Sequence, residues 1–387
     1  RITVGFSQVG AESDWRVANT ESMRESLSEE NGFELLFDNA RQKQENQFKA
    51  IRTFIQQDVD YIVLAPVTET GWESVLEEAR TAGIPVIIVD RQIETDDDSL
   101  YTSWVGSDFR RTADEAVSWL AETLEARESE DAEVQILHLQ GTPGSTAQLQ
   151  RSAALEAGAA SHEGWVITAQ LNGDFTQAKA YEETLAYLQS NPAPDVVYCE
   201  NDNMCFGVMQ ALDELGIAYG TGGVTLISFD AVRRALSYCK DGKIDLCAEC
   251  NPLHGPRVRA LIEQLERGET PEKLYLRVSK KLGDYRVELM AVAYLGDSPQ
   301  ETATAIFEEK SAGLTWECES YPMANGNTAL IPHCTSNPTS MPWTQSVAYF
   351  AQDGILYKAI CRPTGNWFNA SQEDIWAELK VILDGFA

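Results

Sequence analysis

Residues 84–91 read Ile84-Pro85-Val86-Ile87-Ile88-Val89-Asp90-Arg91, and this stretch decides the fold. A continuous apolar run is typical of a parallel strand buried on both faces, and the carboxyl end of such a strand opens onto a crevice in α/β sheets. An acid and a base side by side at that end stand where a small polar ligand binds. Two further apolar runs end in the same way: 196–200 leads into Asn201-Asp202, and 224–229 ends in Asp230. The sequence therefore predicts one polar pocket shared between two sheets.

Strands and helices alternate from residue 1 to about residue 275. The first series reads as strands over 2–8, 33–38, 61–65 and 84–89, with helices over 13–31, 43–57 and 71–82. A second series follows residue 106, with strands over 134–139, 165–170, 196–199 and 224–229 and helices between them. Such alternation predicts a parallel sheet with helices on both faces. We expect two similar lobes, with a ligand in the crevice between them.

The composition is that of an ordinary globular protein, with 387 residues, 43% hydrophobic residues and a mean hydropathy of −0.28. That length provides for two or three domains. The net charge of −30 excludes nucleic acid as a partner, because a polyphosphate would be repelled, and it disfavours an anionic membrane surface. No apolar run approaches the roughly 20 residues of a membrane span.

The chain begins at Arg1, already inside a strand pattern and without an initiator Met. Removal of a signal or anchor segment leaves such a start, and a truncated chain looks the same. Of the eight cysteines, Cys247 and Cys250 form a lone C-x-x-C without the second ligand pair that zinc needs. We interpret the cysteines as structural thiols or disulfides, and their even number is compatible with an oxidising compartment.

The alternation breaks down after about residue 280. Residues 320–352 contain no Asp, Glu, Lys or Arg, and strand-like pieces lie over 346–350 and 355–360. An amphipathic helix is expected over Ser371–Leu383, beginning with a near capping box. This region is predicted to be a small α+β domain appended to the two lobes.

Motifs of catalysis are missing from the sequence. It contains no GxGxxG and no GxSxG, and the loop 141–145 lacks the Lys of a phosphate loop. The four histidines show no spacing typical of a nucleophile and its base, and His138 reads as a core residue inside an apolar strand. We therefore expect a binding protein that is not an enzyme and that needs no cofactor and no metal.

The polar residues around the expected crevice suit a sugar. Each sugar hydroxyl both donates and accepts, so Asp, Asn and Arg serve it well, and the C–H faces of the ring stack on aromatic planes. The candidates are Trp15, Arg16, Asp90, Arg91, Arg151, Asp174, Phe175, Asn201, Asp202, Asp230 and Glu249. Plainer roles stay open for some of them. Trp15 can cap a core, Arg16 and Asp202 can lie at the rim, and Asp174 can be only a helix N-cap beside an inward-packed Phe175.

Several of these segments together resemble the periplasmic sugar-binding proteins of ABC importers, of the ribose and galactofuranose type. The likeness covers residues 1 to about 275. It rests on Val4–Gly10 with Trp15-Arg16, Gln42–Gln47, Ala65–Val67 with Gly71–Glu73, Val89–Arg91, Leu139–Thr142, Gly173–Thr176 and Asn201-Asp202.

The resemblance implies a type I periplasmic binding protein, with two Rossmann-like lobes joined by three hinge crossings and closing on a sugar. By position, hydroxyls would be bound by Asp90, Arg91, Arg151, Asn201 and Asp230. Trp15 and Phe175 would stack on the ring, and Glu249 would fill a position where the family has a carboxylate or amide. The expected division is 1–106 and 252–277 for the first lobe, 107–251 and 278–288 for the second, and 289–387 for the accessory domain.

The function implied is capture of a monosaccharide, galactofuranose or a related aldose, for an ABC permease. We expect a monomer outside the cytoplasm, periplasmic or anchored as a lipoprotein on the outer face. One alternative is a sugar receptor that signals through its C-terminal domain to a membrane histidine kinase or chemoreceptor, because the uncharged stretch 320–352 resembles an interface core. A second is the effector domain of a transcription regulator, which would need a DNA-binding segment before Arg1.

Overall fold

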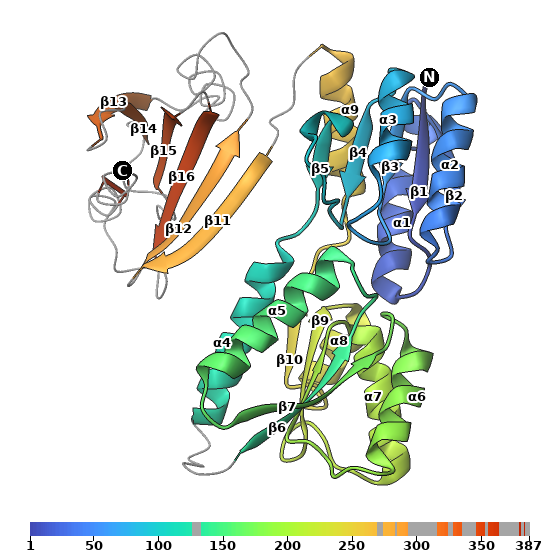
Figure 1. Ribbon diagram of the computed structural model, residues 1–387, viewed down its shortest axis with the longest axis vertical. Helices are drawn as coiled ribbons and strands as arrows, with labels where there is room; N and C mark the ends of the chain where they lie inside the picture. Colours follow the sequence, from blue (N-terminus) through green and yellow to red (C-terminus); the bar gives the residue numbers. More distant parts are fainter. Residues whose placement is uncertain are drawn as a thin grey trace. The chain divides into compact units, whose positions relative to one another are not determined.

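The computed structural model describes residues 1–125, 133–268, 274–282, 285–292, 316–323, 328–334, 346–352, 355–363, 379–380 and 383. The chain divides into two compact units, Arg1–Glu263 and Gln264–Ala387. The first unit contains two lobes, each built on its own parallel sheet, and the second contains an antiparallel sheet (Figure 1). Two α/β lobes followed by a small C-terminal sheet are the architecture predicted from the sequence.

The first lobe is built from the chain's opening strands. They are β1 (Ile2–Gln8), β2 (Phe33–Asn39), β3 (Tyr61–Leu64), β4 (Val86–Val89) and β5 (Ser103–Val105). The sheet order is β2-β1-β3-β4-β5, and every pair is parallel. The helices are α1 (Asp14–Ser26), α2 (Gln44–Gln56), α3 (Glu73–Thr81) and α9 (Gly255–Glu266), with 3-10 turns at Glu29–Asn31 and Asp98–Leu100.

The second lobe repeats this plan. Its strands are β6 (Val134–Gln140), β7 (Trp165–Asn172), β8 (Val196–Cys199), β9 (Thr225–Asp230) and β10 (Leu246–Glu249), in the parallel order β10-β9-β8-β6-β7. Its helices are α4 (Phe109–Glu125), α5 (Thr146–Ser161), α6 (Gln177–Leu188), α7 (Asp202–Leu215) and α8 (Arg233–Lys240).

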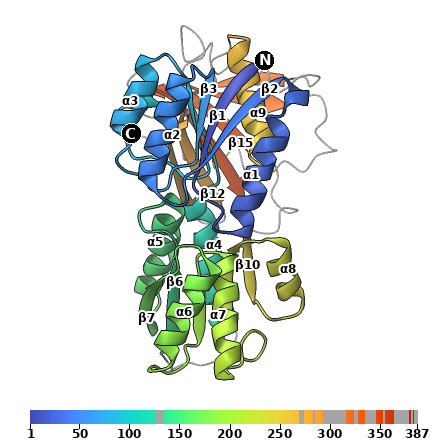
Figure 2. The same ribbon diagram turned by 90° about the vertical axis from the view of Figure 1, so that its right-hand side faces the viewer.

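Apolar side chains bury both faces of each sheet. In the first lobe α2 and α3 pack on one face through one apolar cluster, while α1 and α9 lie on the other face, where the Gly255 N–H donates to Ser22 Oγ at 3.1 Å (Figure 2). In the second lobe α4 and α5 cover one face, and α6, α7 and α8 cover the other. Two-sided burial explains why these strands read as continuous apolar runs.

Two segments carry the chain between the lobes in the part that the structure describes: 106–108, between β5 and α4, and 250–254, between β10 and α9. The sequence predicted a third crossing and placed 278–288 in the second lobe. The structure instead pairs β11 (Leu274–Leu282) with β12 (Tyr285–Val292) in the third sheet. Only two residues separate these strands, so little loop entropy opposes their pairing. The expected lobe limits at residues 106 and 252 stay predictions.

The third sheet is antiparallel and belongs to the C-terminal unit. Its further strands are β13 (Trp316–Pro322), β14 (Thr328–Cys334), β15 (Ser346–Gln352) and β16 (Ile355–Pro363), in the order β11-β12-β16-β15-β14-β13. Strands β14 and β15 come from the uncharged stretch 320–352. The helix expected over Ser371–Leu383 lies outside the described residues except at 379, 380 and 383. Among the described helices, none has both the length and the apolar character needed to cross a bilayer.

One close contact in the first lobe gives a test of its packing. A Cβ added at Gly5 in β1 would lie 2.4 Å from Cγ of Phe54 in α2, which is itself buried. Gly5→Ala should therefore overpack this layer and lower the free energy of unfolding by about 1–3 kcal/mol in urea denaturation. Glu45→Ala, at an exposed position of the same helix, is the control and should change stability by about 0.5 kcal/mol or less. Equal stability of the two variants would contradict the packing described.

Candidate functional site

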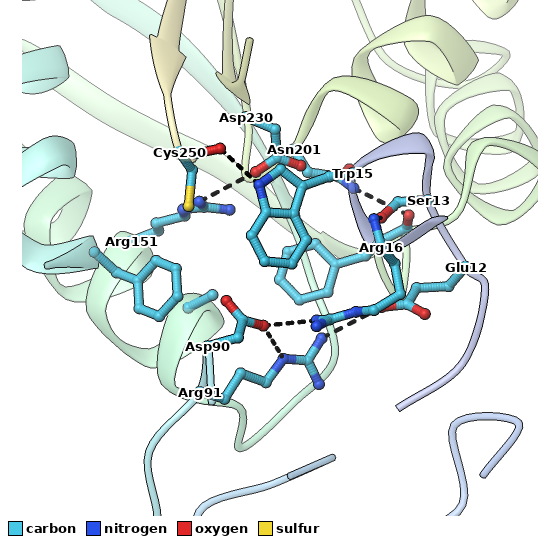
Figure 3. A pocket seen from close by; sticks show the side chains of 13 residues that line it. Glu12, Ser13, Trp15, Arg16, Asp90, Arg91, Arg151, Asn201, Asp230 and Cys250 are labelled. Carbon is cyan, nitrogen blue, oxygen red and sulfur yellow. Dashed lines mark hydrogen bonds and ion pairs between the residues drawn. The ribbon is translucent and has the colours of Figure 1, made fainter. Parts of the chain in front are cut away.

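The carboxyl ends of the strands in both lobes meet around one cavity (Figure 3). Most of the predicted site residues line it: Trp15, Arg16, Asp90, Arg91, Arg151, Phe175, Asn201 and Asp230. Parallel strands bring their carboxyl ends to the same edge of a sheet, which explains why residues far apart in the sequence converge here.

The wall from the first lobe is a network of buried charges. Arg16 Nη2 lies 2.7 Å from Asp90 Oδ2, and Arg16 Nε lies 3.0 Å from Glu12 Oε1. Arg91 Nη1 donates to the Val67 carbonyl at 2.8 Å, and its Nη2 lies 3.8 Å from Glu12 Oε1. Burial opposes the charge of Arg16, but Asp90 and Glu12 outweigh it and raise the pKa of this guanidinium. Burial and the neighbouring Arg16 charge lower the pKa of Arg91 to about 10.

The wall from the second lobe carries a further pair of opposite charges. Arg151 in α5 donates to the Glu200 carbonyl, and its Nη2 lies 3.3 Å from Asp230 Oδ1. Its guanidinium stacks on Phe229, 4.7 Å from the ring centroid. Burial raises the pKa of Asp230 well above its ordinary value, although the charge of Arg151 opposes this shift. The pair is therefore held in place by stacking and by a backbone acceptor.

Two aromatic side chains face the cavity in fixed orientations. The indole N–H of Trp15 donates to the Cys250 carbonyl at 2.6 Å, which anchors the ring across the lobes. The Phe175 ring lies so close to Gly141 that a Cβ there would be 1.9 Å from its Cζ. Arg91 lies over Phe175, 5.3 Å from the centroid. Both rings can offer an apolar plane to a ligand.

Several site residues adopt the left-handed backbone region that non-glycine residues rarely enter. Asp90 has a φ of 63°, Phe175 of 61° and Asp230 of 104°, and Ala231 follows with 57°. Each such residue costs of order 1–3 kcal/mol and persists only where its surroundings impose it, and such strain concentrates at functional sites. The three strained side chains all face the same cavity.

Four buried polar atoms of the cavity wall have no hydrogen-bond partner among the described residues: Glu12 Oε2, Arg16 Nη1, Arg91 Nε and Arg151 Nε. Leaving a buried polar atom unpaired costs about 1–3 kcal/mol, so four around one cavity mark a place for a polar ligand. Three of them are donors and one is an acceptor. The lining includes three carboxyl and three guanidinium side chains, so their formal charges cancel. The cavity therefore suits a neutral ligand with groups that both donate and accept.

The two lobes bond directly to each other around the cavity. The Glu69 N–H donates to the Gly144 carbonyl at 2.9 Å, and the Gln92 N–H donates to Thr146 Oγ1 at 2.8 Å. On the other side the Asp14 N–H donates to Asn203 Oδ1 at 3.0 Å. The structure is thus a closed form of the pair of lobes.

The structure places two predicted residues outside the cavity. Asp174 lies beside the start of α6 with its carboxylate on Lys179, and Glu249 is exposed at the end of β10. Asp202 lies behind the wall, fully buried and bonded to Ser228 and Val232. Asn201 lines the cavity. It is also the N-cap of α7, since its side chain accepts a hydrogen bond from the Met204 N–H.

Sequence reasoning missed five lining residues, which are Glu12, Ser13, Phe109, Ala147 and Cys250. Glu12 had a readable signal, because it lies four positions before Arg16. Phe109 and Cys250 adjoin the two crossings between the lobes, whereas Ser13 and Ala147 lie at the starts of α1 and α5. No group of three His, Cys, Asp or Glu side chains suited to a metal ion occurs among the described residues.

Comparison with known proteins matches residues 4–252 to the family model of the periplasmic binding protein domain. The galactofuranose-binding protein of Escherichia coli K12 is 36% identical over 282 residues, which cover 72% of this chain and 86% of that protein. A structure from Mycobacterium smegmatis in complex with beta-D-fucofuranose is 38% identical, with a TM-score of 0.67, covering 70% of this chain and 88% of that one. The binding protein of the arabinose ABC transporter of Shewanella sp. ANA-3, bound to alpha- and beta-L-arabinofuranose, is 37% identical, with a TM-score of 0.65 and coverages of 70% and 87%.

The pKa of Asp230 gives a pH-dependent test of the site. A folded-state pKa above the unfolded value means that the folded protein binds the proton more tightly, so Asp230 lowers stability as pH rises through that interval. Asp230→Asn removes this titration, and Asn tolerates the left-handed backbone. The free energy of unfolding of the variant, relative to the unchanged protein, should increase between pH 4 and pH 7 without ligand.

The matched control for this comparison is Asp58→Asn, at an exposed aspartate with a φ of 53°. As a substitution at an exposed position, it should change the free energy of unfolding by about 0.5 kcal/mol or less. A pH-independent effect of Asp230→Asn would show that Asp230 titrates alike in the folded and unfolded chain.

Proposed function

The chain belongs to the periplasmic binding protein domain family, and from this premise we propose that it captures a neutral monosaccharide between its lobes and delivers it to the permease of an ABC importer. Membership confirms the resemblance drawn from the sequence and the type I architecture. The relatives are binding proteins rather than enzymes, in agreement with the expectation of no catalysis.

The observation that carries this proposal is the set of unpartnered donors and acceptors in a charge-balanced cavity. A sugar hydroxyl offers one donor and two acceptor positions, so it can serve a carboxylate and a guanidinium at once. Arg16 and Arg91 point donors into the cavity, and Glu12 supplies a free acceptor. A phosphate or carboxylate ligand would satisfy the arginines but would be repelled by Glu12, Asp90 and Asp230.

We propose the furanose form as the ring bound. The three similar proteins named above are a galactofuranose-binding protein and two structures holding fucofuranose and arabinofuranose. Trp15 and Phe175 would cover the ring, and Asp90, Arg91, Arg151, Asn201 and Asp230 would bind its hydroxyls. Arg16 would orient Asp90 through Nη2 and offer its unpartnered Nη1 to a hydroxyl.

We propose that the protein works outside the cytoplasm, because its relatives in this family are periplasmic components of importers. Attachment as a lipoprotein, action as a monomer and a signalling partner remain expectations from the sequence. The relatives reported above support transport and give no support to the sensory alternative. We propose that closure around the sugar, held by contacts such as Gln92 to Thr146, is the state that the permease recognises.

A thermal-shift panel tests the ligand class. The panel holds D-galactose, L-arabinose, D-fucose, D-ribose, D-fructose and myo-inositol, with galactose 6-phosphate and galacturonate as charged counterparts. Neutral aldoses that form furanoses should raise Tm, and the charged sugars should not. A shift with the charged sugars alone would overturn the proposed neutral site.

Substitution of the Asp90-Arg91 pair tests the residues. Loss of one hydrogen-bonding group to a buried ligand costs about 1–3 kcal/mol, more for a charged group, so Asp90→Ala and Arg91→Ala should each weaken sugar binding at least about tenfold in calorimetry. Because Asp90→Ala leaves the Arg16 charge unpaired, Asp90→Asn serves as the variant that retains shape. Glu249→Ala, outside the cavity, is the control and should bind as the unchanged protein does. Unchanged affinity in all three pair variants would show that the pocket is elsewhere.

A further inference from the structure

We propose that Gln42 is a positioning residue for the bound sugar: when the lobes close, its side-chain amide bonds to the turn Asp174-Phe175 and holds the Phe175 ring in place. The inference rests on the proposed function, because the ring is positioned for a ligand in the cavity. Gln42 itself does not line that cavity. It begins the segment Gln42–Gln47, one of the stretches that carry the resemblance to sugar-binding proteins.

The turn that carries Phe175 is strained. Asp174 and Phe175 are consecutive residues in the left-handed region, with φ of 51° and 61°. A residue as bulky as Phe rarely adopts this conformation, so contacts around the turn must impose it. The ring is 5% exposed and lines the cavity. Its orientation toward a ligand therefore depends on the groups that hold the turn.

Hydrogen bonds from both lobes hold this turn. Within the second lobe, the Asp174 N–H donates to Asn172 Oδ1 at 2.9 Å, and Asn201 Nδ2 donates to the Phe175 carbonyl at 3.1 Å. From the first lobe, Gln42 Nε2 donates to the Asp174 carbonyl at 3.2 Å. Asn172 and Asn201 stay beside the turn in any arrangement of the lobes. The bond from Gln42 crosses between the lobes, so it can form only when they are closed.

The first lobe fixes Gln42 by contacts of its own. Gln42 follows the edge strand β2, and its N–H donates to the Val9 carbonyl, just beyond β1, at 2.7 Å. Arg41 and Gln42 have φ of 53° and 61°, so this loop is also held in the left-handed region. A Cβ added at Gly10 would lie 3.3 Å from Gln42 Cγ, which shows how closely the side chain packs. The amide is therefore oriented by its own lobe before it meets the turn.

Closure of the lobes and stacking of the ring are coupled by this bond. In the open protein the Asp174 carbonyl lacks the amide of Gln42, and the strained turn has one contact fewer to oppose its relaxation. Closure supplies that contact and fixes the Phe175 ring against the sugar. A ligand that permits complete closure gains the stacking, whereas a ligand that holds the lobes apart loses it. Gln42 thus contributes to the choice of ligand without touching it.

Gln42→Glu tests the bond in calorimetry. The variant keeps the length of the side chain but presents an oxygen to the Asp174 carbonyl where the amide donated. The Kd for D-galactose or L-arabinose should rise about tenfold.

The matched control is Asn191→Asp. Asn191 Nδ2 donates to the Tyr187 carbonyl at 2.9 Å, and both residues lie in the second lobe. This variant also replaces a donating amide by a carboxylate and adds the same charge, but its bond does not cross between the lobes. Its Kd should stay within about twofold of that of the unchanged protein.

A double-mutant cycle with Phe175→Leu separates positioning of the ring from a general loss of closure. If Gln42 acts through the ring, Gln42→Glu should change the Kd by less than about twofold in the Phe175→Leu background, since no aromatic plane remains to be positioned. An equal loss of affinity in both backgrounds would show that Gln42 only holds the lobes together, and it would overturn the proposal.

Hydrogen exchange at saturating sugar gives a second readout, which needs no binding by Phe175→Leu. The segment 173–176, in which the Thr176 N–H donates to the Gly173 carbonyl, should exchange faster in Gln42→Glu than in the unchanged protein. The Gln92 amide, which bonds across the lobes to Thr146 Oγ1, should be protected alike in both. Equal exchange of 173–176 in the two proteins, or faster exchange at Gln92 as well, would contradict the inference.

The outcomes distinguish this inference from the proposed function. If no neutral sugar of the thermal-shift panel binds the unchanged protein, the proposed function fails and the role of Gln42 fails with it. If a sugar binds and Gln42→Glu has the same Kd as Asn191→Asp, the proposed function stands and only the role of Gln42 is wrong.

Discussion

The site depends on the ion pair between Arg16 and Asp90, whose side chains are each 4% exposed. Removing either charge from water costs several kcal/mol, and the partner at 2.7 Å, together with Glu12 at 3.0 Å from Arg16, offsets that cost. Arg16 follows β1, and Asp90 follows β4, with β3 between these strands in the sheet. The pair can therefore form only if the parallel order is correct. A surface pair of the same composition would contribute little, so burial gives this pair its importance.

The surroundings of the pair hold Asp90 in a conformation that its own backbone does not favour. The Asp90 N–H donates to the Val105 carbonyl at 2.8 Å, and its carbonyl accepts from the Trp104 indole at 3.2 Å. Gly106 is needed beside it, because a Cβ there would lie 2.5 Å from the Asp90 oxygen. The carboxylate is thus oriented before any ligand arrives. Such preorganisation lowers the ordering cost of binding, and it is provided by the first crossing between the lobes.

The sequence predicted both parallel sheets, because a strand buried on two faces reads as an apolar run. It also predicted most of the cavity residues, because parallel strands place their carboxyl ends at the same edge of the sheet. The resemblance placed Glu249 in the site, at a position where the family has a carboxylate or amide. β10 is an edge strand, however, and its last side chain turns to solvent. Phe109 and Cys250 were missed because hinge geometry, which leaves no periodic pattern, brings them in. The pairing of β11 with β12 was missed because alternation alone does not specify which sheet a strand joins.

The balance of charge in the cavity differs sharply from that of the whole chain. The protein carries a net charge of −30, and its field repels anions approaching from any direction. Within the cavity, three carboxylates and three guanidinium groups form ion pairs with distances of 2.7 to 3.8 Å. Because opposite charges alternate around the wall, their electric field falls off over a short distance. A charged ligand would meet both the global repulsion and an unmatched acid inside. A neutral polyol avoids both, because each of its hydroxyls can lie between an acid and a base. The charge pattern therefore disfavours charged sugars, and discrimination between neutral sugars depends on the shape of the cavity.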